Sequence, residues 1–327
     1  MRKAFLLFCC VSAVLLFSSW GFLGHRTIHQ LAVYQLPKKI KPFFYTELKY
    51  LVYNSVRPDE RRSADPMEAS KHFIDLEAYG ADAAVSMPIN WNEAVAMYSK
   101  DSLLKYGYVP YWVVAMQQKL TEAFRAGNKD SILFYAADLG HYISDAHVPL
   151  HTSLNYDGQL SGQKGLHSLW ETMVPEIEIN NYDLYNHHHA QYIAHPAEAI
   201  WKAVRQAHLL VGAVFTEEIE ATKEFTDATK YRIQQRNGRE VKSYSTEFAK
   251  AYSKRLGATI NQQLVSAASL CSDFWYTAWV DAGKPDLNVT FNKSQKKAFK
   301  KEYKRYKKNE LIQQGLLLSR QTKTGED

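Results

Sequence analysis

The sequence predicts an all-α fold, built as a single compact multi-helix domain. Apolar residues recur at helical spacing along most of the chain, and prolines mark the ends of several such segments. No segment shows the sustained alternation of apolar and polar residues that is typical of a half-buried strand. About 300 residues follow an initial apolar segment, enough to bury a large core, and no Gly/Ser-rich or Pro-rich linker precedes Pro285.

The amino-terminal residues have the layout of a secretory signal. Met1-Arg2-Lys3 are followed by an apolar run over residues 4–17 and then by Ser18-Ser19. This run is shorter than the about 20 apolar residues that a membrane-spanning helix needs. We therefore predict a signal peptide over residues 1–19 and an exported bacterial protein, periplasmic or secreted, with no transmembrane helix after signal removal.

Cysteine usage is consistent with an exported protein that has no disulfide. Cys9 and Cys10 lie inside the predicted signal, so the mature chain retains only Cys271 and cannot form an internal bridge. Its stability is then expected to depend on its core and on bound metals. A lipoprotein anchored through Cys10 is a weaker alternative, because Phe8 and Cys9 are not the small residues expected before a lipidated cysteine.

Helices are expected over residues 25–35, 110–126, 130 to about 147, 166–173, 196–211 and 245–282. In the first segment, apolar residues at helical spacing continue up to Pro37, which ends it. The second carries a stripe of large side chains: Trp112, Val113, Met116, Leu120 and Phe124. The third ends near His147, because Pro149 disfavours the helical conformation at Val148. The last three continue the same pattern.

A basic carboxyl-terminal tail is predicted over residues 285–327. Lysine and arginine pairs between residues 296 and 308 are interleaved with Phe299, Tyr303 and Tyr306. One interpretation is a basic helix for nucleic acid or an anionic membrane. The favoured one is a solvated, partly frayed terminal helix, because charge runs are usually exposed. The tail accounts for most of the net charge of +6, so this charge indicates little about the substrate.

The region from His141 to Glu171 has the spacing of metal ligands. His141 precedes Asp145 by one helical turn, and His167 precedes Glu171 by the same interval. Residues four apart share a helix face, so each pair can point into one cavity, and His151 follows from a loop. A single such pair is usually a surface ion pair or a cap. Their combination supplies enough nitrogen and oxygen ligands for more than one zinc ion.

Further candidate ligands lie upstream of this region. Cleavage after Ser19 would leave the α-amine of Trp20 beside its own carbonyl oxygen, a pair of atoms that can chelate a cation. With His25, an acidic residue and His72, the order of ligands resembles that of the superfamily of zinc-dependent phospholipases C and single-strand-specific nucleases. The resemblance covers the chain from Trp20 to about Ala282, and it implies a zinc-dependent phosphodiesterase domain over residues 20–284.

The resemblance implies a centre of three zinc ions and a ligand set for each. The first zinc would be held by Asp59, His72, His141 and Asp145. The second would be held by His151, His167 and Glu171. The third would be held by the Trp20 amine and carbonyl, His25 and the other oxygen of Asp145. It also implies that a metal-bound hydroxide attacks phosphorus and that Asp59, as the catalytic residue, orients the water or takes its proton.

Several neighbouring residues compete for these roles. Asp65 and Asp75 are alternatives to Asp59, although the Pro58-Asp59 context and its distance from His72 match the family better. His29, one turn after His25, is expected to have a core or supporting role. His147 lies about 200° around the helix from Asp145 and should face elsewhere. The run of histidines at 187–189 is expected to be a solvated loop.

The choice of phosphodiester substrate stays open between two branches of the superfamily. The short gap between His151 and His167, together with Glu171 where the nucleases carry Asp, resembles the bacterial phospholipases C. The spacing from Trp20 to His25 resembles the nucleases. We therefore expect a phospholipase C-like hydrolase of phospholipid or another phosphodiester, which allows peripheral membrane contact. The alternatives are a single-strand-specific endonuclease of DNA or RNA and a catalytically silent metal- or anion-binding protein.

Overall fold

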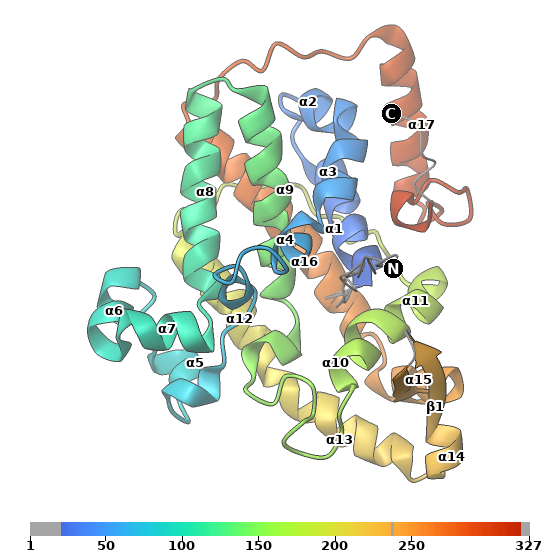
Figure 1. The fold of residues 1–327 in the computed structure, drawn as a ribbon. Coiled ribbons are helices and arrows are strands. Elements are labelled where there is room, and N and C mark those ends of the chain that lie inside the picture. The colour runs from blue at the N-terminus through green and yellow to red at the C-terminus, as the bar shows by residue number, and fades with distance from the viewer. Residues whose placement is uncertain (1–20, 237–238, 322–327) are drawn as a thin grey trace, which may run out of the picture.

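A computed structural model describes residues 21–236 and 239–321 of the chain, and helices make up most of it (Figure 1). The longer helices are α1 (Gly21–Gln35), α6 (Trp91–Tyr98), α8 (Val109–Arg125), α9 (Lys129–Asp145), α12 (Pro196–Leu209), α13 (Val211–Thr222), α15 (Thr246–Leu256), α16 (Thr259–Asp281) and α17 (Lys293–Tyr306). Shorter helices are α2 (Lys41–Thr46), α3 (Leu48–Asn54), α4 (Arg57–Arg61), α5 (Ala83–Ser86), α7 (Lys100–Tyr106), α10 (Leu166–Ser168), α11 (Val174–Glu178) and α14 (Asp227–Lys230). The prediction of an all-α fold is confirmed.

The remaining helical turns are 3-10 or π segments. They are η1 (Ala69–Lys71), η2 (Leu76–Tyr79), η3 (Pro149–Thr152), η4 (Leu169–Met173), η5 (Ile179–Asn181) and η6 (Leu318–Arg320). Among them, η4 is a π turn that joins α10 to α11 without a break. Pro175 explains it, because proline has no N–H to close the α-helical bond to the carbonyl of Glu171. The expected helix over 166–173 therefore contains a change of pitch at the residue that was expected to bind metal.

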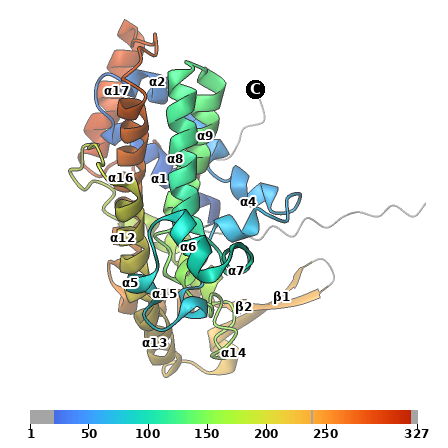
Figure 2. The same ribbon diagram turned by 90° about the vertical axis from the view of Figure 1, so that its left-hand side faces the viewer.

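The prediction that the chain contains no strand is wrong at one place. Strands β1 (Tyr231–Arg236) and β2 (Arg239–Tyr244) form a two-stranded antiparallel hairpin that projects from the helical body (Figure 2). Tyr231 pairs with Tyr244 at the base of the hairpin, and the apolar residues farther along it, Ile233 and Val241, are exposed. Because the hairpin buries only this end, its sequence lacks the alternation that identifies a strand.

Four helices, α1, α8, α9 and α16, pack together as the core of the molecule (Figure 1). The helices α8 and α9 are antiparallel neighbours, and α16 crosses behind them with its fully buried Trp275 donating a hydrogen bond to the Ala136 carbonyl at 2.9 Å. The expected helix over 245–282 is divided into α15 and α16 at Gly257, whose φ of 59° favours glycine. This bundle fixes the relative positions of α1 and α9.

A close approach between α1 and α9 depends on Gly140. A Cβ atom at this position would lie 2.4 Å from Nε2 of His29 and 3.0 Å from Sγ of Cys271. The residue after Gly140 is His141, and His25 lies one turn before His29. Gly140 therefore allows the two helices to bring these histidines together.

The carboxyl-terminal segment is folded, so the expectation of a frayed terminal helix is wrong for the described residues. Phe299, Tyr303 and Tyr306 fall at helical spacing on the inner side of α17, and Tyr306 is only 1% exposed. The Glu302 carboxylate accepts hydrogen bonds from the hydroxyls of Tyr34 and Tyr45. The aromatic residues between the lysines are therefore a packing stripe against α1 and α2.

Beyond α17, the chain returns along α1. Gln30 on α1 donates to the Leu316 carbonyl at 2.8 Å, and the hydroxyls of Thr27 and Ser319 are 2.8 Å apart. Leu311 and Leu317 are buried in the same core. Within residues 21–236 and 239–321, no helix is long and apolar enough to cross a membrane.

Candidate metal centre

Eight of the nine residues predicted as metal ligands converge at one end of α1 and α9. Trp20, the ninth, lies outside the described residues. His25 comes from α1, Asp59 from α4, His72 from the end of η1, and His141 and Asp145 from α9. His151 comes from η3, His167 from α10 and Glu171 from η4. Their side chains are almost fully buried, apart from that of His167, which is 22% exposed.

The first group consists of Asp59, His72 and His141, with Asp145 in contact. Nδ1 of His72 lies 2.9 Å from Oδ2 of Asp145 and 3.0 Å from Nε2 of His141. Oδ1 of Asp59 lies 3.7 Å from the same His72 nitrogen and 3.8 Å from Nε2 of His141. Four potential donor atoms from three segments of the chain therefore surround one point.

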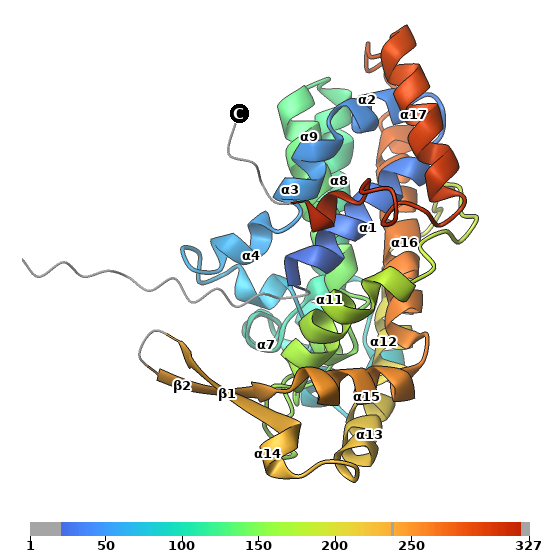
Figure 3. The same cartoon turned by 90° about the vertical axis from the view of Figure 1, so that its right-hand side faces the viewer.

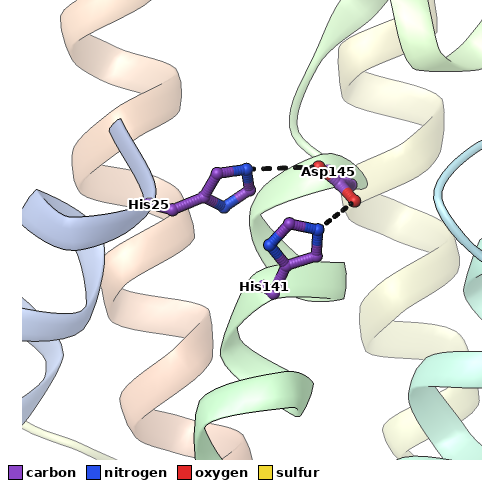
Figure 4. Close-up of side chains that lie close together, drawn as sticks. All are labelled: His25, His141 and Asp145. Atoms are coloured by element: carbon purple, nitrogen blue, oxygen red, sulfur yellow. Dashed lines mark ion pairs between the residues drawn. The ribbon is translucent and has the colours of Figure 1, made fainter. Parts of the chain in front are cut away.

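Asp145 directs its two carboxylate oxygens to different partners (Figure 4). Oδ2 lies 3.2 Å from Nε2 of His141, whereas Oδ1 lies 3.6 Å from Nε2 of His25. The imidazole rings of His25 and His141 stack with their centroids 4.1 Å apart. His25, His141 and Asp145 thus form a second group that could hold a metal, and this group shares His141 with the first.

A third group contains His151, His167 and Glu171. Nε2 of His151 lies 3.4 Å from Nε2 of His167 and 3.7 Å from Oε2 of Glu171. The His167 nitrogen also contacts this Glu171 oxygen directly. Oδ1 of Asp145 lies 3.6 Å from Nδ1 of His151, so the three groups form one continuous cluster.

Backbone carbonyls orient three of these histidines. The Nδ1–H groups of His141, His151 and His167 donate to the carbonyl oxygens of Ser55, His72 and Tyr156 at 2.7, 2.9 and 3.2 Å, respectively. The opposite nitrogen, Nε2, is the one that faces the ligand groups in each case. A hydrogen bond of this kind fixes the tautomer and leaves the lone pair on Nε2 available for a metal.

Burial and mutual contact shift the pKa values of the acidic groups in opposite directions. Burial raises the pKa of Asp59 above its ordinary value. Burial also acts to raise the pKa of Asp145, but the imidazoles of His141 and His151 lower it well below the ordinary value. The two carboxyl groups therefore differ in basicity, and Asp59 is the one with the greater affinity for a proton.

The donor set fits zinc. Ligands about 2.0–2.1 Å from a tetrahedral zinc ion lie about 3.3 Å apart, which is close to the separations around His72 and His141. Among the residues that the structure describes, neither carboxylate oxygen of Asp59 has a hydrogen-bond partner, although both are buried. Buried charged atoms are rarely left in this way unless another group satisfies them, and a cation would do so.

The residues set aside on sequence grounds lie outside the three groups. His29 contacts the carbonyl oxygens of His25 and Ala137, and His147 contacts that of Ile143, so both are core residues. Asp65 has a side chain 45% exposed and lies 3.7 Å from Lys71. The run of histidines at 187–189 lies in a loop in which His187 and His189 are exposed, whereas Nε2 of the partly buried His188 is hydrogen-bonded to Oδ1 of Asp273 at 2.8 Å.

Three residues near the groups were not found by sequence reasoning. Arg62 Nη1 lies 3.7 Å from Oδ1 of Asp59, and Glu68 Oε1 lies 3.6 Å from Nε2 of His72. Tyr156 is 52% exposed, and its ring centroid is 6.5 Å from that of His167. The spacing of three between Asp59 and Arg62 was a usable signal, because it places both on one face of a helix. The positions of Glu68 and Tyr156 near the ligand groups depend on the tertiary fold, so the local sequence gives no signal for them.

A comparison with protein families identifies the chain independently of this geometry. The sequence model of the S1/P1 nuclease family matches residues 20–269 of the 327-residue chain. No curated protein matches the chain. The expected resemblance is confirmed, because this family belongs to the superfamily of zinc-dependent phospholipases C and nucleases. The chain therefore belongs to the S1/P1 nuclease family and is a zinc-dependent phosphodiester hydrolase.

Proposed function

We propose that this protein is an exported nuclease that hydrolyses single-stranded nucleic acid with three zinc ions. The observation that carries the proposal is the division of the Asp145 carboxylate between two ligand groups, with the third group in contact. This arrangement suits several cations held a few ångströms apart, as a multi-metal phosphodiesterase requires. Membership of a nuclease family supports nucleic acid as the substrate.

In this proposal the first zinc lies in the first group, the second zinc in the third group, and the third zinc in the second group. The first zinc takes Asp59, His72, His141 and Oδ2 of Asp145. The second takes His151, His167 and Glu171. The third takes His25, Oδ1 of Asp145 and the amine and carbonyl of Trp20. The start of the family match at residue 20 supports a mature chain that begins there, after an export signal over residues 1–19.

In this proposal, the side chains around the three ligand groups have different roles in phosphodiester hydrolysis. When bound, the zinc ions would neutralise the phosphodiester and lower the pKa of a water molecule. Oδ1 of Asp59 faces His72 and His141, so Oδ2 is left to orient the attacking water and accept its proton. Arg62, whose side chain is 37% exposed, would donate hydrogen bonds to a phosphate oxygen from the solvent side of Asp59.

Tyr156 supports a nucleic-acid substrate over a phospholipid. Its carbonyl oxygen accepts the His167 hydrogen bond, so its position is tied to the third group. Its ring is half exposed beside that histidine. An exposed aromatic ring next to the reacting phosphate provides a surface on which a base can stack.

A phospholipase C remains the second candidate, and two observations favour it. Glu171 and the short gap between His151 and His167 are the features that resemble bacterial phospholipases. The loop that fills this gap exposes Leu154 by 38% and Leu160 by 68%. Exposed leucines beside an active site are suited to contact with acyl chains.

Substrate assays on matched variants separate the two candidates. The zinc-loaded protein is assayed on single-stranded DNA, phosphatidylcholine micelles and a small soluble phosphodiester. Tyr156→Ala should lower kcat/KM on DNA about tenfold and leave the small substrate unaffected, because only a base stacks on the ring. Leu160→Ala, from the same loop, should leave DNA cleavage unchanged.

The remaining outcomes identify the alternatives. Turnover of phosphatidylcholine that is lost in Leu160→Ala, without DNA cleavage, would establish the phospholipase. Zinc binding at about two to three ions per chain without turnover of any substrate would indicate the silent binding protein. A chain that binds no zinc after reconstitution would overturn both enzymatic proposals.

A further inference from the structure

The outer face of α17 concentrates positive charge. Its exposed lysines, with two in the turn that follows, are Lys293, Lys296, Lys297, Lys300, Lys301, Lys304, Lys307 and Lys308. At 100° per residue they occupy a single arc of the helix. Within it, Lys293, Lys297, Lys300 and Lys304 succeed one another at intervals of three or four residues. Such neighbours are about 5–6 Å apart, so their ammonium groups can form a continuous row.

In the described part of the chain, no carboxylate forms an ion pair with this row. The only acidic residue of α17 is Glu302, and it points inward to accept hydrogen bonds from Tyr34 and Tyr45. The next acidic residue, Glu310, pairs with Arg305 at 2.5 Å. Among the residues that the structure describes, none of the lysines of the row forms an ion pair. The face is therefore a positive surface of lysines without ion-pair partners among the described residues, on an ordered helix.

A hollow of about 420 Å³ lies along the same face. Its lining consists of Phe299, Lys300, Tyr303, Lys304, Lys307 and Lys308. The rings of Phe299 and Tyr303 stack with their centroids 5.4 Å apart, and Nζ of Lys307 lies 5.8 Å from the centroid of Tyr303. Positively charged grooves are a means by which proteins follow the backbone of a single strand, since lysines contact its phosphates.

The composition of this face argues against an anionic membrane as the partner. Helices that lie in a membrane interface insert large apolar side chains between the lipids. On α17, no large hydrophobic side chain is exposed. Phe299 packs edge-on against Tyr45, and Tyr306 contacts Tyr34, so the aromatic residues are already used by the core. A charged surface without exposed apolar side chains is better suited to a polyanionic strand.

We propose that the lysine face of α17 is a second binding surface for single-stranded nucleic acid, distinct from the metal centre. The proposal rests on the proposed function, because it assumes a nucleic-acid substrate. Tyr34, which anchors Glu302, follows His25 by nine residues, or about 14 Å along α1. Figure 3 shows α17 at the edge of the molecule, on the far side of α1 from the hairpin. A strand held there would raise the local substrate concentration without occupying the metal centre.

This surface also lies outside the segment shared with the family. The family match ends at residue 269, within α16, and α17 begins at Lys293. The surface therefore lies on a part of the chain that the family match does not include. It is expected to affect the affinity for long strands and not the hydrolytic step itself.

The test uses the full-length, zinc-loaded protein and a phosphorothioate single-stranded oligonucleotide that resists hydrolysis. The test variant combines Lys297→Gln, Lys300→Gln, Lys304→Gln and Lys308→Gln. The control variant removes the same charge from exposed lysines on α8, α12 and α15: Lys119→Gln, Lys202→Gln, Lys250→Gln and Lys254→Gln. A third variant restores the charge with arginine at the four test positions.

Binding is measured as a function of salt concentration. In the test variant, the slope of log affinity against log salt should fall by about 2–3, because each lost contact with a single strand removes about 0.7. Affinity at low salt should fall about tenfold or more. The control and arginine variants should bind like the wild type. Equal slopes in the test and control variants, or a loss of binding in the arginine variant, would overturn the proposal.

Two more measurements separate this proposal from the function on which it rests. If the oligonucleotide binds through these lysines but single-stranded DNA is not cleaved, the surface is established and the proposed nuclease is not. If DNA is cleaved and the test variant binds normally, the proposed nuclease is established and the second binding surface is refuted. Loss of binding to phosphatidylserine vesicles in the test variant, with normal binding of the oligonucleotide, would assign the face to membranes and refute the proposal.

Discussion

Oε1 of Glu68 lies 3.6 Å from Nε2 of His72, on the side of the imidazole opposite the nitrogen that faces Asp145. The Glu68 side chain is 1% exposed, and it also contacts the Tyr142 hydroxyl and Nζ of Lys71. A carboxylate in this position favours a proton on Nε2 and a lone pair on Nδ1. It would therefore orient His72 towards a metal in the first group.

Glu68→Gln is expected to lower the zinc affinity of the first group about tenfold or more, because the amide orients the imidazole less strongly than the carboxylate does. Competition with a chromogenic chelator measures this affinity without any assay of activity. Glu60→Gln is the control, since Glu60 is exposed on α4 and should leave the affinity unchanged. Equal zinc affinity in the two variants would show that Glu68 does not position His72.

Gly140→Ala is expected to destabilise the protein by about 1–3 kcal/mol, the usual cost of overpacking a core. The added methyl group would meet the ring of His29 at 2.4 Å and push α1 away from α9. Gly212→Ala on α13 is the matched control, because a Cβ there meets no atom within 4 Å. Alanine at that position should be neutral or slightly stabilising. Thermal unfolding of both variants, with their zinc content, provides the measurement.

Local sequence patterns were sufficient to predict the helical fold and most of the candidate site. His141 and Asp145 are four residues apart in a helical segment, and so are His167 and Glu171. Local helix geometry alone therefore places the two members of each pair close together. Asp59 was harder to assign, because Asp65 and Asp75 have the same chemistry and lie in the same region. Only the folded chain distinguishes them, since Asp59 alone lies beside His72 and His141.

Other features depend on contacts between segments that are distant in the chain. Glu68 acquires its role from the position of His72 relative to Asp145. The spacing of Phe299, Tyr303 and Tyr306 could be recognised in the sequence, but the residues on α1 and α2 against which they pack could not. The hairpin at Tyr231 and Tyr244 was missed because a mostly polar, two-stranded hairpin has no buried face to generate an alternating pattern.

Zinc affinity at the His151, His167 and Glu171 group is expected to decrease as the pH falls through about 7. In the metal-free chain, burial raises the pKa of Glu171 to about 7. Burial alone would lower the pKa of His167, but the Glu171 carboxylate raises it overall. The pair therefore retains a proton near neutral pH, and zinc must displace it because metal ligands bind in the deprotonated form.

Titration of zinc into the metal-free protein at several pH values tests this linkage. The affinity should be greatest above pH 7 and should decline below it, with release of a proton on binding. Glu171→Gln removes the titrating carboxyl, so its weaker zinc binding should vary less with pH. An affinity that is independent of pH in the wild-type protein between about 6 and 8 would contradict the assignment.

Truncation after Pro285 is expected to lower the Tm by about 10 °C or more. The truncated chain loses three buried side chains, Tyr306, Leu311 and Leu317, each of which contributes about 1.5–3 kcal/mol. It also leaves the hydroxyls of Tyr34 and Tyr45 without Glu302. The variant with glutamine at four lysines of α17 should retain the wild-type Tm. A truncated chain of unchanged Tm would show that this segment does not support α1.

The amino terminus is expected to supply the last ligand of the third zinc. The helix α1 begins at Gly21, and a Cβ at Gly21 would lie 2.9 Å from Cγ2 of Thr172, the neighbour of Glu171. Gly21 therefore lies at the edge of the ligand groups. Coordination by the Trp20 amine requires a free, neutral nitrogen, because an amide has no available lone pair.

A variant that retains one extra methionine before Trp20 should therefore bind one zinc ion fewer and lose most of its activity. Protein that begins at Trp20, produced by proteolytic removal of a leader, is the control. Metal analysis and mass spectrometry of the intact chain measure zinc content and the first residue together. Full zinc content and activity in the extended variant would exclude the amine as a ligand, and would leave the groups around His72 and His167 unaffected.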